Sequence, residues 1–206
     1  MQNKDLWRAQ LNNVNHALDY FLCGDGKYRA YSESSAQSLS SKVTGIIRSI
    51  ADTEFTDDLI ATDYLYAPAS TRHHGDFRGG LLCHSLLVTK RLLEFTISNN
   101  LQWKRVQSPV LVGMLHDLCK VYAYVIDDNG YTHYTYIPVH GHAEKSLAFI
   151  VKYGLKITEE EMLCILHHMG AYETDSWAEY DAAIKQYPNV LWTHTADMYA
   201  SKVDGV

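Results

Sequence analysis

The stretch "LVGMLHDLCK", residues 111–120, constrains the fold more than any other feature of this chain, because it sets His116 and Asp117 side by side in an otherwise apolar helical run. Burying an imidazole beside a carboxylate is costly unless something compensates the lost hydration. Three arrangements would do so: a helix end at which both groups reach water, a structural His–Asp hydrogen bond, or a bound metal ion. The rest of the sequence bears on the choice.

Apolar residues recur every three or four positions along most of the chain, which is typical of amphipathic helices. The segment "LWRAQLNNVNHALDYFL" (6–22) shows this spacing, and a second helix is expected to begin near Ser34 or Ser35. The same pattern predicts further helices at roughly 80–98, 108–120, 141–153, 158–169, 177–186 and 188–202. The sequence therefore predicts an all-α fold.

One β feature interrupts the helices. The runs "VYAYVI" and "YTHYTYIPV" flank "DDNG", and Asn-Gly between two β-rich runs is a strong hairpin signal. We expect a small hairpin at about 121–139, inserted between two of the helices. Alternation along the first strand would place Tyr122, Tyr124 and Ile126 on one face.

The chain is expected to fold as one compact unit. Its 206 residues can bury a full core, and no repeat, low-complexity tract or linker divides them. Within that unit we expect residues 1–65 to form a helical extension packed on a core of residues 66–206.

Charge and composition argue against several classes of protein. The net charge is −6 with no basic block, which disfavours long nucleic acid as a partner. No apolar run approaches the roughly 18 residues of a membrane span, and no secretory signal is visible. The four cysteines are scattered without a CxxC pair, so free thiols in a reducing cytoplasm are expected.

Residues that can ligate metals are concentrated on the predicted helices. Ten of the eleven histidines follow residue 70. Each candidate ligand lies beside apolar residues that would anchor its helix, so the polar groups are expected to meet in one interior cleft. Neutral imidazole and carboxylate suit borderline divalent ions such as Mn, Fe, Co, Ni or Zn. The candidates are His84, His116, Asp117, His142, His167, His168 and Asp197.

Five sequence elements occur in an order typical of one family: "GGLLCHS", "MLHDLCK", "GHAEKS", "HHMG" and "HTADMYASK". With them the chain resembles the HD-domain superfamily of metal-dependent phosphohydrolases, over about residues 70–202. The resemblance implies an HD-type helical bundle that holds one or two divalent ions (Mn, Fe, Ni, Co, Zn or Mg). It also implies an intracellular enzyme that cleaves a phosphoester of a nucleotide-type substrate with metal-activated water.

The resemblance also implies how the ligands are shared. The first ion would be held by four residues, and Asp117 would bridge from them to a second ion. His142 and His168 would hold that second ion, with His167 as an additional candidate. The four ligands implied for the first ion are His84, His116, Asp117 and Asp197.

Several residues are candidates for contact with the substrate. Lys120, one helical turn beyond His116, and Lys145, from "GHAEKS", are expected to bind phosphate and assist catalysis. Glu144 could orient a ligand or accept a proton. Arg78 could form a two-pronged contact with a phosphate, and Tyr134 on the hairpin could stack on a nucleobase.

Other functions remain open. Some of the most similar HD modules belong to 3′–5′ exoribonucleases, so short oligonucleotides or cyclic nucleotides are alternative substrates. Those enzymes carry an added OB domain, however, and residues 1–65 show no five-strand pattern. The GYP element of the cyclic dinucleotide hydrolases is not present. A non-catalytic metal- or nucleotide-binding module is the alternative from another class, and a homo-oligomer is left open.

Overall fold

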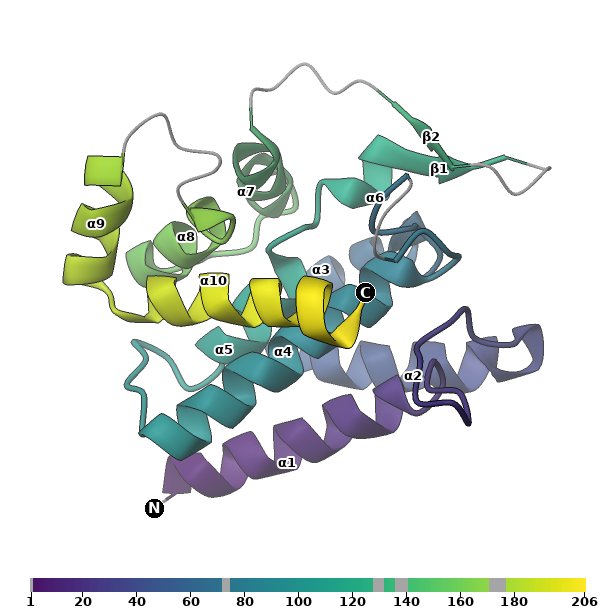
Figure 1. Ribbon diagram of the computed structural model, residues 1–206, viewed down its shortest axis with the longest axis horizontal. Coiled ribbons are helices and arrows are strands. Elements are labelled where there is room, and N and C mark those ends of the chain that lie inside the picture. The colour runs from purple at the N-terminus through teal and green to yellow at the C-terminus, as the bar shows by residue number, and fades with distance from the viewer. Residues whose placement is uncertain (1, 72–74, 128–131, 136–140, 171–176) are drawn as a thin grey trace.

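The computed structural model describes residues 2–71, 75–127, 132–135, 141–170 and 177–206. Within these residues the protein is a bundle of helices with a single two-stranded hairpin at one end (Figure 1). The predicted all-α fold is therefore confirmed.

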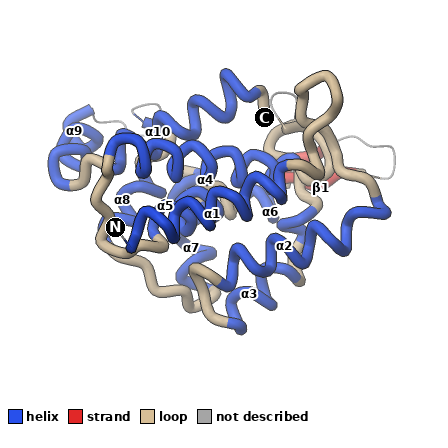
Figure 2. Tube along the Cα trace, turned by 90° about the horizontal axis from the view of Figure 1, so that it is seen from below, coloured by secondary structure: helices blue, strands red, loops and turns tan. Residues whose placement is uncertain are grey.

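The N-terminal region contributes three helices: α1 (Gln2–Leu18), α2 (Ala36–Arg48) and α3 (Thr53–Ile60). The first two match the sequence pattern, although α1 ends four residues before the expected limit. Helix α3 was not predicted. Its start is marked by Asp52, whose side chain accepts a hydrogen bond from the backbone N–H of Phe55 at 2.9 Å. Seen from below, α1 lies over the later helices, with α2 and α3 beside it (Figure 2).

Helix α4 (Gly80–Asn99) runs through the middle of the bundle and packs against α1, α5 (Ser108–Leu115) and α10 (Asn189–Tyr199). The α4–α5 contact is unusually close, because a Cβ atom on Gly113 would lie only 2.4 Å from Oγ1 of Thr89. Glycine therefore permits an approach that any larger residue would prevent. This approach brings the helices that carry His84 and His116 together.

Three helices complete the bundle: α7 (His142–Lys152), α8 (Glu159–Leu166) and α9 (Trp177–Gln186). Helix α8 begins with a capping box between Thr158 and Glu161 and packs against α5, α7 and α10. Buried residues from α1 and α2 belong to the same apolar cluster as those of α4, α5 and α10. After α10 the chain continues into a π-helical turn, η4 (Ala200–Asp204).

The predicted helix at 108–120 is too long. Helix α5 ends at Leu115, residues 116–119 form a turn, and a short helix, α6 (Lys120–Ala123), follows. Because α6 takes up the start of the predicted hairpin, Tyr122 lies on a helix and not on a strand. There its ring packs on Phe149, with centroids 4.5 Å apart.

The hairpin itself pairs β1 (Tyr124–Ile126) with β2 (Thr132–Tyr134) in antiparallel register, Tyr124 opposite Tyr134. It is shorter than the predicted 121–139. The Asn-Gly step and residues 136–139 lie outside the described residues.

Two further sequence predictions can be compared with the structure. All four cysteines fall in the described part of the chain and are free thiols. Among the helices described, not one has the length and apolarity needed to cross a membrane.

Candidate metal centre

The His116–Asp117 pair lies where α5 ends, but it does not reach water. The side chains are 0% and 2% exposed, respectively. Of the three arrangements that could compensate burial, exposure at a helix end is therefore excluded. The neighbours of the pair decide between a structural hydrogen bond and a metal ion.

Four side chains from α4, α10 and the end of α5 converge on one point. Nε2 of His84 lies 3.0 Å from Oδ1 of Asp197 and 3.6 Å from Oδ2 of Asp117. Nε2 of His116 lies 3.4 Å from the same Asp117 oxygen and 3.8 Å from Asp197 Oδ1. These four residues, here called the first donor group, are those implied for the first ion: His84, His116, Asp117 and Asp197.

A second group of donors meets the other oxygen of Asp117. Its Oδ1 lies 3.3 Å from Nε2 of His142 and 3.5 Å from Nε2 of His168. The two imidazole nitrogens are 3.1 Å apart. Asp117, His142 and His168 form the second donor group. Asp117 thus belongs to both groups and offers one carboxylate oxygen to each, which is the bridging arrangement that the resemblance implies.

Backbone carbonyl groups orient three of the histidines. Nδ1 of His84, His116 and His168 lies 2.8, 2.9 and 2.7 Å from the carbonyl oxygens of residues 206, 113 and 165. A carbonyl oxygen can only accept, so each Nδ1 carries the donated proton. In the neutral ring Nε2 is then an unprotonated acceptor that points into the cluster. This is the tautomer that metal-ligating histidines adopt.

Around His84 and His116 the cluster consequently brings lone pairs together with no proton between them. Nε2 of His84 and Nε2 of His116 are 3.3 Å apart, and both face carboxylate oxygens. Among described residues, Asp117 Oδ1 has no hydrogen-bond donor although it is buried. A native structure seldom leaves a buried carboxylate oxygen without a donor. A cation between these atoms would satisfy all of them, so the donor set fits a divalent metal ion.

The carboxylates remain charged in spite of their burial. Burial raises the pKa of Asp117, but Lys120, whose Nζ lies 2.6 Å from Oδ2, and His116 outweigh it and hold that pKa well below its usual range. Burial likewise raises the pKa of Asp197, and the neighbouring imidazole of His84 outweighs burial and brings that pKa below its usual value. Burial lowers the pKa of His116, which favours the neutral ring. Charged carboxylates and neutral imidazole are the forms that bind metal.

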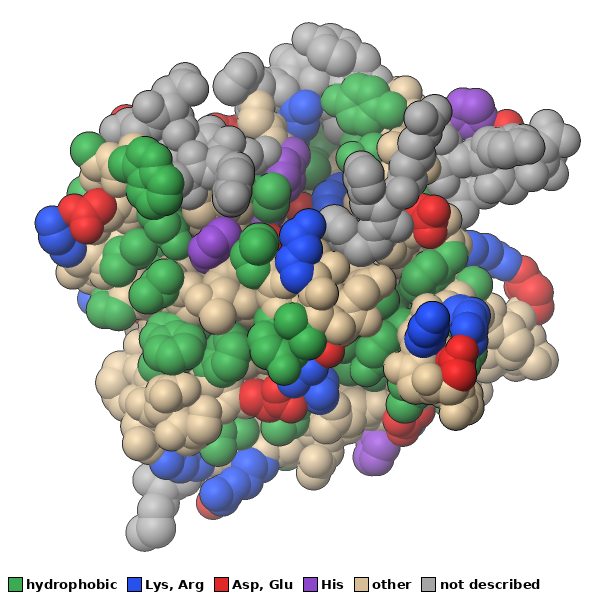
Figure 3. Space-filling model, in the orientation of Figure 1, with side chains coloured by type: hydrophobic (Ala, Val, Ile, Leu, Met, Phe, Trp, Pro, Cys, Tyr) green, Lys and Arg blue, Asp and Glu red, His purple; other side chains and the backbone are tan. Residues whose placement is uncertain are grey.

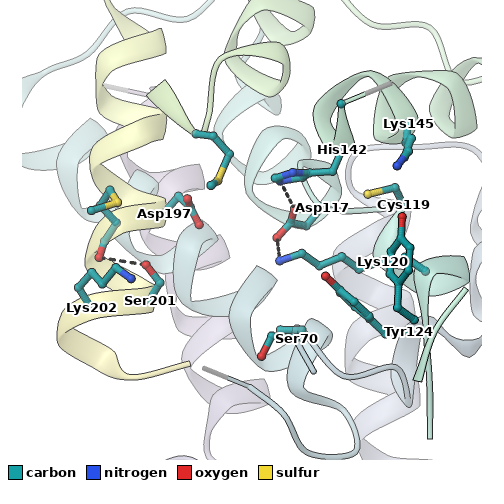
Figure 4. Close-up of a pocket in the computed structure, with 16 residues that line it drawn as sticks. Ser70, Asp117, Cys119, Lys120, Tyr124, His142, Lys145, Asp197, Ser201 and Lys202 are labelled. Carbon is teal, nitrogen blue, oxygen red and sulfur yellow. Dashed lines mark hydrogen bonds and ion pairs between the residues drawn. The ribbon is translucent and has the colours of Figure 1, made fainter. Parts of the chain in front are cut away.

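A cavity of about 470 Å³ opens beside the cluster. Its floor includes Asp117, His142 and Asp197, and three lysines line its walls (Figure 4). On the face of the molecule above α10, histidine and basic side chains reach the surface (Figure 3). Lys145 and Lys202 project from opposite sides of the cavity in Figure 4, with Asp117 between them. The hairpin contributes Tyr124 and Tyr134, whose ring centroids are 5.9 Å apart.

Three predicted site residues lie elsewhere. His167 is buried outside both donor groups, beside Tyr180, and no hydrogen-bond partner in the described residues meets its Nδ1. Glu144 lies in the first turn of α7 and does not line the cavity. Arg78 pairs with Glu33 and stacks over the ring of Tyr66 at 4.7 Å, away from the cavity.

Sequence reasoning missed three residues at this site. Lys202 and Tyr124 line the cavity, and Val206 supplies the carbonyl that orients His84. Lys202 is the last residue of the element "HTADMYASK", so its place in that element could have marked it as a site residue. The Val206 contact had none, because a backbone carbonyl has no sequence signature.

No protein-family model, no curated protein and no solved structure matches this chain. The centre is therefore defined by its geometry. His84, His116, Asp117, His142 and His168 form a buried His/Asp cluster that could hold a metal ion, compatible with an HD domain.

Proposed function

We propose that this protein is a metal-dependent phosphohydrolase of the HD-domain type that cleaves a phosphoester in a small, nucleotide-type substrate. The observation that carries the proposal is the division of Asp117 between two donor groups, one oxygen to each, at the floor of a lysine-lined cavity. The ordered HD-like sequence elements supply the same ligands independently.

The donor groups fit one or two divalent ions. His84, His116, Asp117 and Asp197 would hold one, and Asp117, His142 and His168 the other. Bound there, the ions would supply Lewis acidity, lowering the pKa of a water molecule and neutralising charge that develops on phosphoryl oxygens. A chain that uses such ions needs no nucleophilic side chain, and the sequence contains no GxSxG element.

The protein's own contribution is to place the phosphate. Lys145 and Lys202 line the cavity, and in the described part of the chain no carboxylate forms an ion pair with either ammonium group. Each can therefore bind an anionic oxygen without first releasing a carboxylate. Lys120 is already paired with Asp117, and burial and this carboxylate act in opposite directions on its pKa, with a net rise. It remains cationic and borders the cavity next to the metal donors, where a phosphoryl group would lie.

The aromatic pair on the hairpin supports a base-bearing substrate. Tyr124 and Tyr134 both face the cavity, and the ring of Tyr134 is half exposed, which leaves it free to stack. Stacking of a base on an aromatic side chain contributes about 1–3 kcal/mol. The cavity has the volume of a small-molecule site rather than a polymer groove, which favours a nucleotide over long nucleic acid.

The test is a substrate panel assayed together with metal content. Nucleoside monophosphates, dNTPs, cyclic nucleotides, short RNA and a simple aryl phosphate would be offered to the protein with Mn²⁺, Co²⁺, Ni²⁺ and Mg²⁺. The proposal expects metal-dependent phosphate release that Asp117→Ala abolishes and Lys185→Met, at an exposed lysine paired with Asp181, leaves intact. Tight metal binding without turnover of any substrate would favour a non-catalytic binding module instead.

A further inference from the structure

The last turn of the chain is fixed to α4 by a buried ion pair. Arg91 donates from Nε and Nη2 to the two carboxylate oxygens of Asp204, at 3.0 and 2.5 Å. Both side chains are largely buried, and the guanidinium also lies 4.2 Å from the ring centroid of Tyr199. A two-pronged contact of this kind fixes orientation as well as distance.

The residue that follows this anchor reaches the metal centre. Gly205 adopts a left-handed conformation, with φ of 80°, and turns the chain so that Val206 packs inward. The N–H of Val206 donates to the carbonyl of Ala200 at 3.2 Å, and its own carbonyl oxygen accepts from Nδ1 of His84 at 2.8 Å. Arg91 and His84 are seven residues apart and thus lie on the same face of α4. The segment spans the two.

The contact to His84 differs from those of the other oriented histidines. His116 and His168 use carbonyl groups three residues earlier in their own chain segment, at Gly113 and Ile165. Those acceptors are present whenever the local turn is formed. The acceptor for His84 is 122 positions away in sequence, so the tautomer and ring orientation of this donor depend on tertiary contacts.

We infer that residues 200–206 form a positioning element for the first donor group. Anchored by the Arg91–Asp204 pair, the segment holds the Val206 carbonyl against His84 and so keeps Nε2 of that ring unprotonated and directed at Asp117 and Asp197. The inference rests on the proposed metal site and adds to it a remote residue pair that tunes one donor group and not the other.

Single-group backgrounds test this directly. His168→Ala leaves the first donor group complete, and His84→Ala leaves the second. Co²⁺ affinity would be measured by competition with a chromogenic chelator in each background, with and without Arg91→Gln. Changes around a metal-ligating histidine typically cost 10–100-fold in affinity. We expect Arg91→Gln to weaken Co²⁺ binding about tenfold in the His168→Ala background and by less than twofold in the His84→Ala background. Asp204→Asn should reproduce this pattern.

Arg105→Gln is the matched control, because Arg105 makes a similar two-pronged contact with buried Glu161, and their other described partners are Lys156, Ser108 and Thr158 rather than a donor residue. It should lower the unfolding temperature comparably and leave Co²⁺ affinity unchanged in both backgrounds. Equal weakening in both backgrounds, or none in either, would overturn the inference while leaving the metal site intact. If the unsubstituted protein bound no Co²⁺, the proposed function and this inference would fall together.

Discussion

Two regions of this molecule bury carboxylates, and they do so in opposite ways. In the first, Glu160 and Glu161 of α8 are almost fully buried, and every oxygen has a donor. Glu161 accepts from Arg105, from the hydroxyl of Ser108 and from the backbone N–H of Thr158. Glu160 accepts from the N–H of Lys104 at 2.6 Å and from Asn189 at 2.8 Å. This region is complete as it stands and needs no further ligand.

In the metal centre the protein leaves the same chemistry incomplete. Asp117 has one donor, Lys120, on Oδ2 and none from the described residues on Oδ1, while unprotonated imidazole nitrogens face the carboxylates. Both regions are equally buried, so burial alone does not indicate function. What differs is whether donors match acceptors. A buried carboxylate whose oxygens all have donors is satisfied by the fold itself, whereas an excess of buried acceptors is an arrangement that a bound cation would satisfy.

The largest effect expected is from removal of the shared ligand. Asp117→Ala takes one oxygen from each donor group, so both should lose metal and hydrolysis should fall to background. Metal content by elemental analysis and phosphate release would be measured on the same preparation. Because the substitution also removes the carboxylate that pairs with Lys120, the fold of the variant would be checked by circular dichroism on the same preparation. Full activity in a metal-free Asp117→Ala protein would break the comparison.

A substitution in the other region, at Glu161, should lower the free energy of unfolding and leave metal binding unchanged. Glu161→Gln removes the charge that pairs with Arg105, and breaking a buried ion pair typically costs about 3–5 kcal/mol. Because Arg105 is partly exposed, we expect about 3 kcal/mol from denaturant unfolding. Metal content per folded chain should be unchanged. Loss of metal in Glu161→Gln would mean that the two regions are not separable.

The cavity lysines should govern binding of the phosphate more than the stability of the fold. Removing a hydrogen bond to a charged group costs roughly 1.5 kcal/mol or more, which is about tenfold in affinity. Lys145→Met and Lys202→Met should each raise KM about tenfold and leave unfolding and metal content unchanged. Lys185→Met provides the surface control. An unaltered KM in both cavity variants would show that Lys145 and Lys202 do not bind the phosphate.

The smallest predicted effect concerns the hairpin. Tyr134→Ala should raise KM about fivefold for a nucleotide, which corresponds to about 1 kcal/mol of stacking, and leave KM for a simple aryl phosphate ester nearly unchanged. The ratio of the two KM values is the measurement. An equal change for both substrates would count against base stacking and assign Tyr134 to packing.

The sequence was most informative where the signal is local. Apolar spacing predicted most of the helices, and the Asn-Gly step between β-rich runs predicted the hairpin pair. Helix α3 was not predicted, because its eight residues are too few to show a clear apolar period. The break after Leu115 was missed because Leu118 and Cys119 resume the apolar run beyond His116 and Asp117, although the chain there forms a turn.

The residues of the two donor groups could be predicted because each lies in a recognisable element, and the structure brings six of the seven candidates together. His167 adjoins His168 in sequence, but consecutive positions leave a helix end in different directions, and the ring of His167 packs on Tyr180. Arg78 was expected at a phosphate, and its pairing with Glu33 is a tertiary contact between distant segments. Contacts of that kind, like the Val206 carbonyl at His84, cannot be inferred from residue type and spacing.

The central claim is that Asp117 and its histidine neighbours bind divalent cations. Anomalous scattering from crystals of the protein grown with Co²⁺ measures this without reference to any substrate. We predict a peak between His84, His116, Asp117 and Asp197, and a second between Asp117, His142 and His168 when both groups are filled. Fully occupied Co²⁺ sites elsewhere on the protein, with no peak against Asp117, would contradict the account.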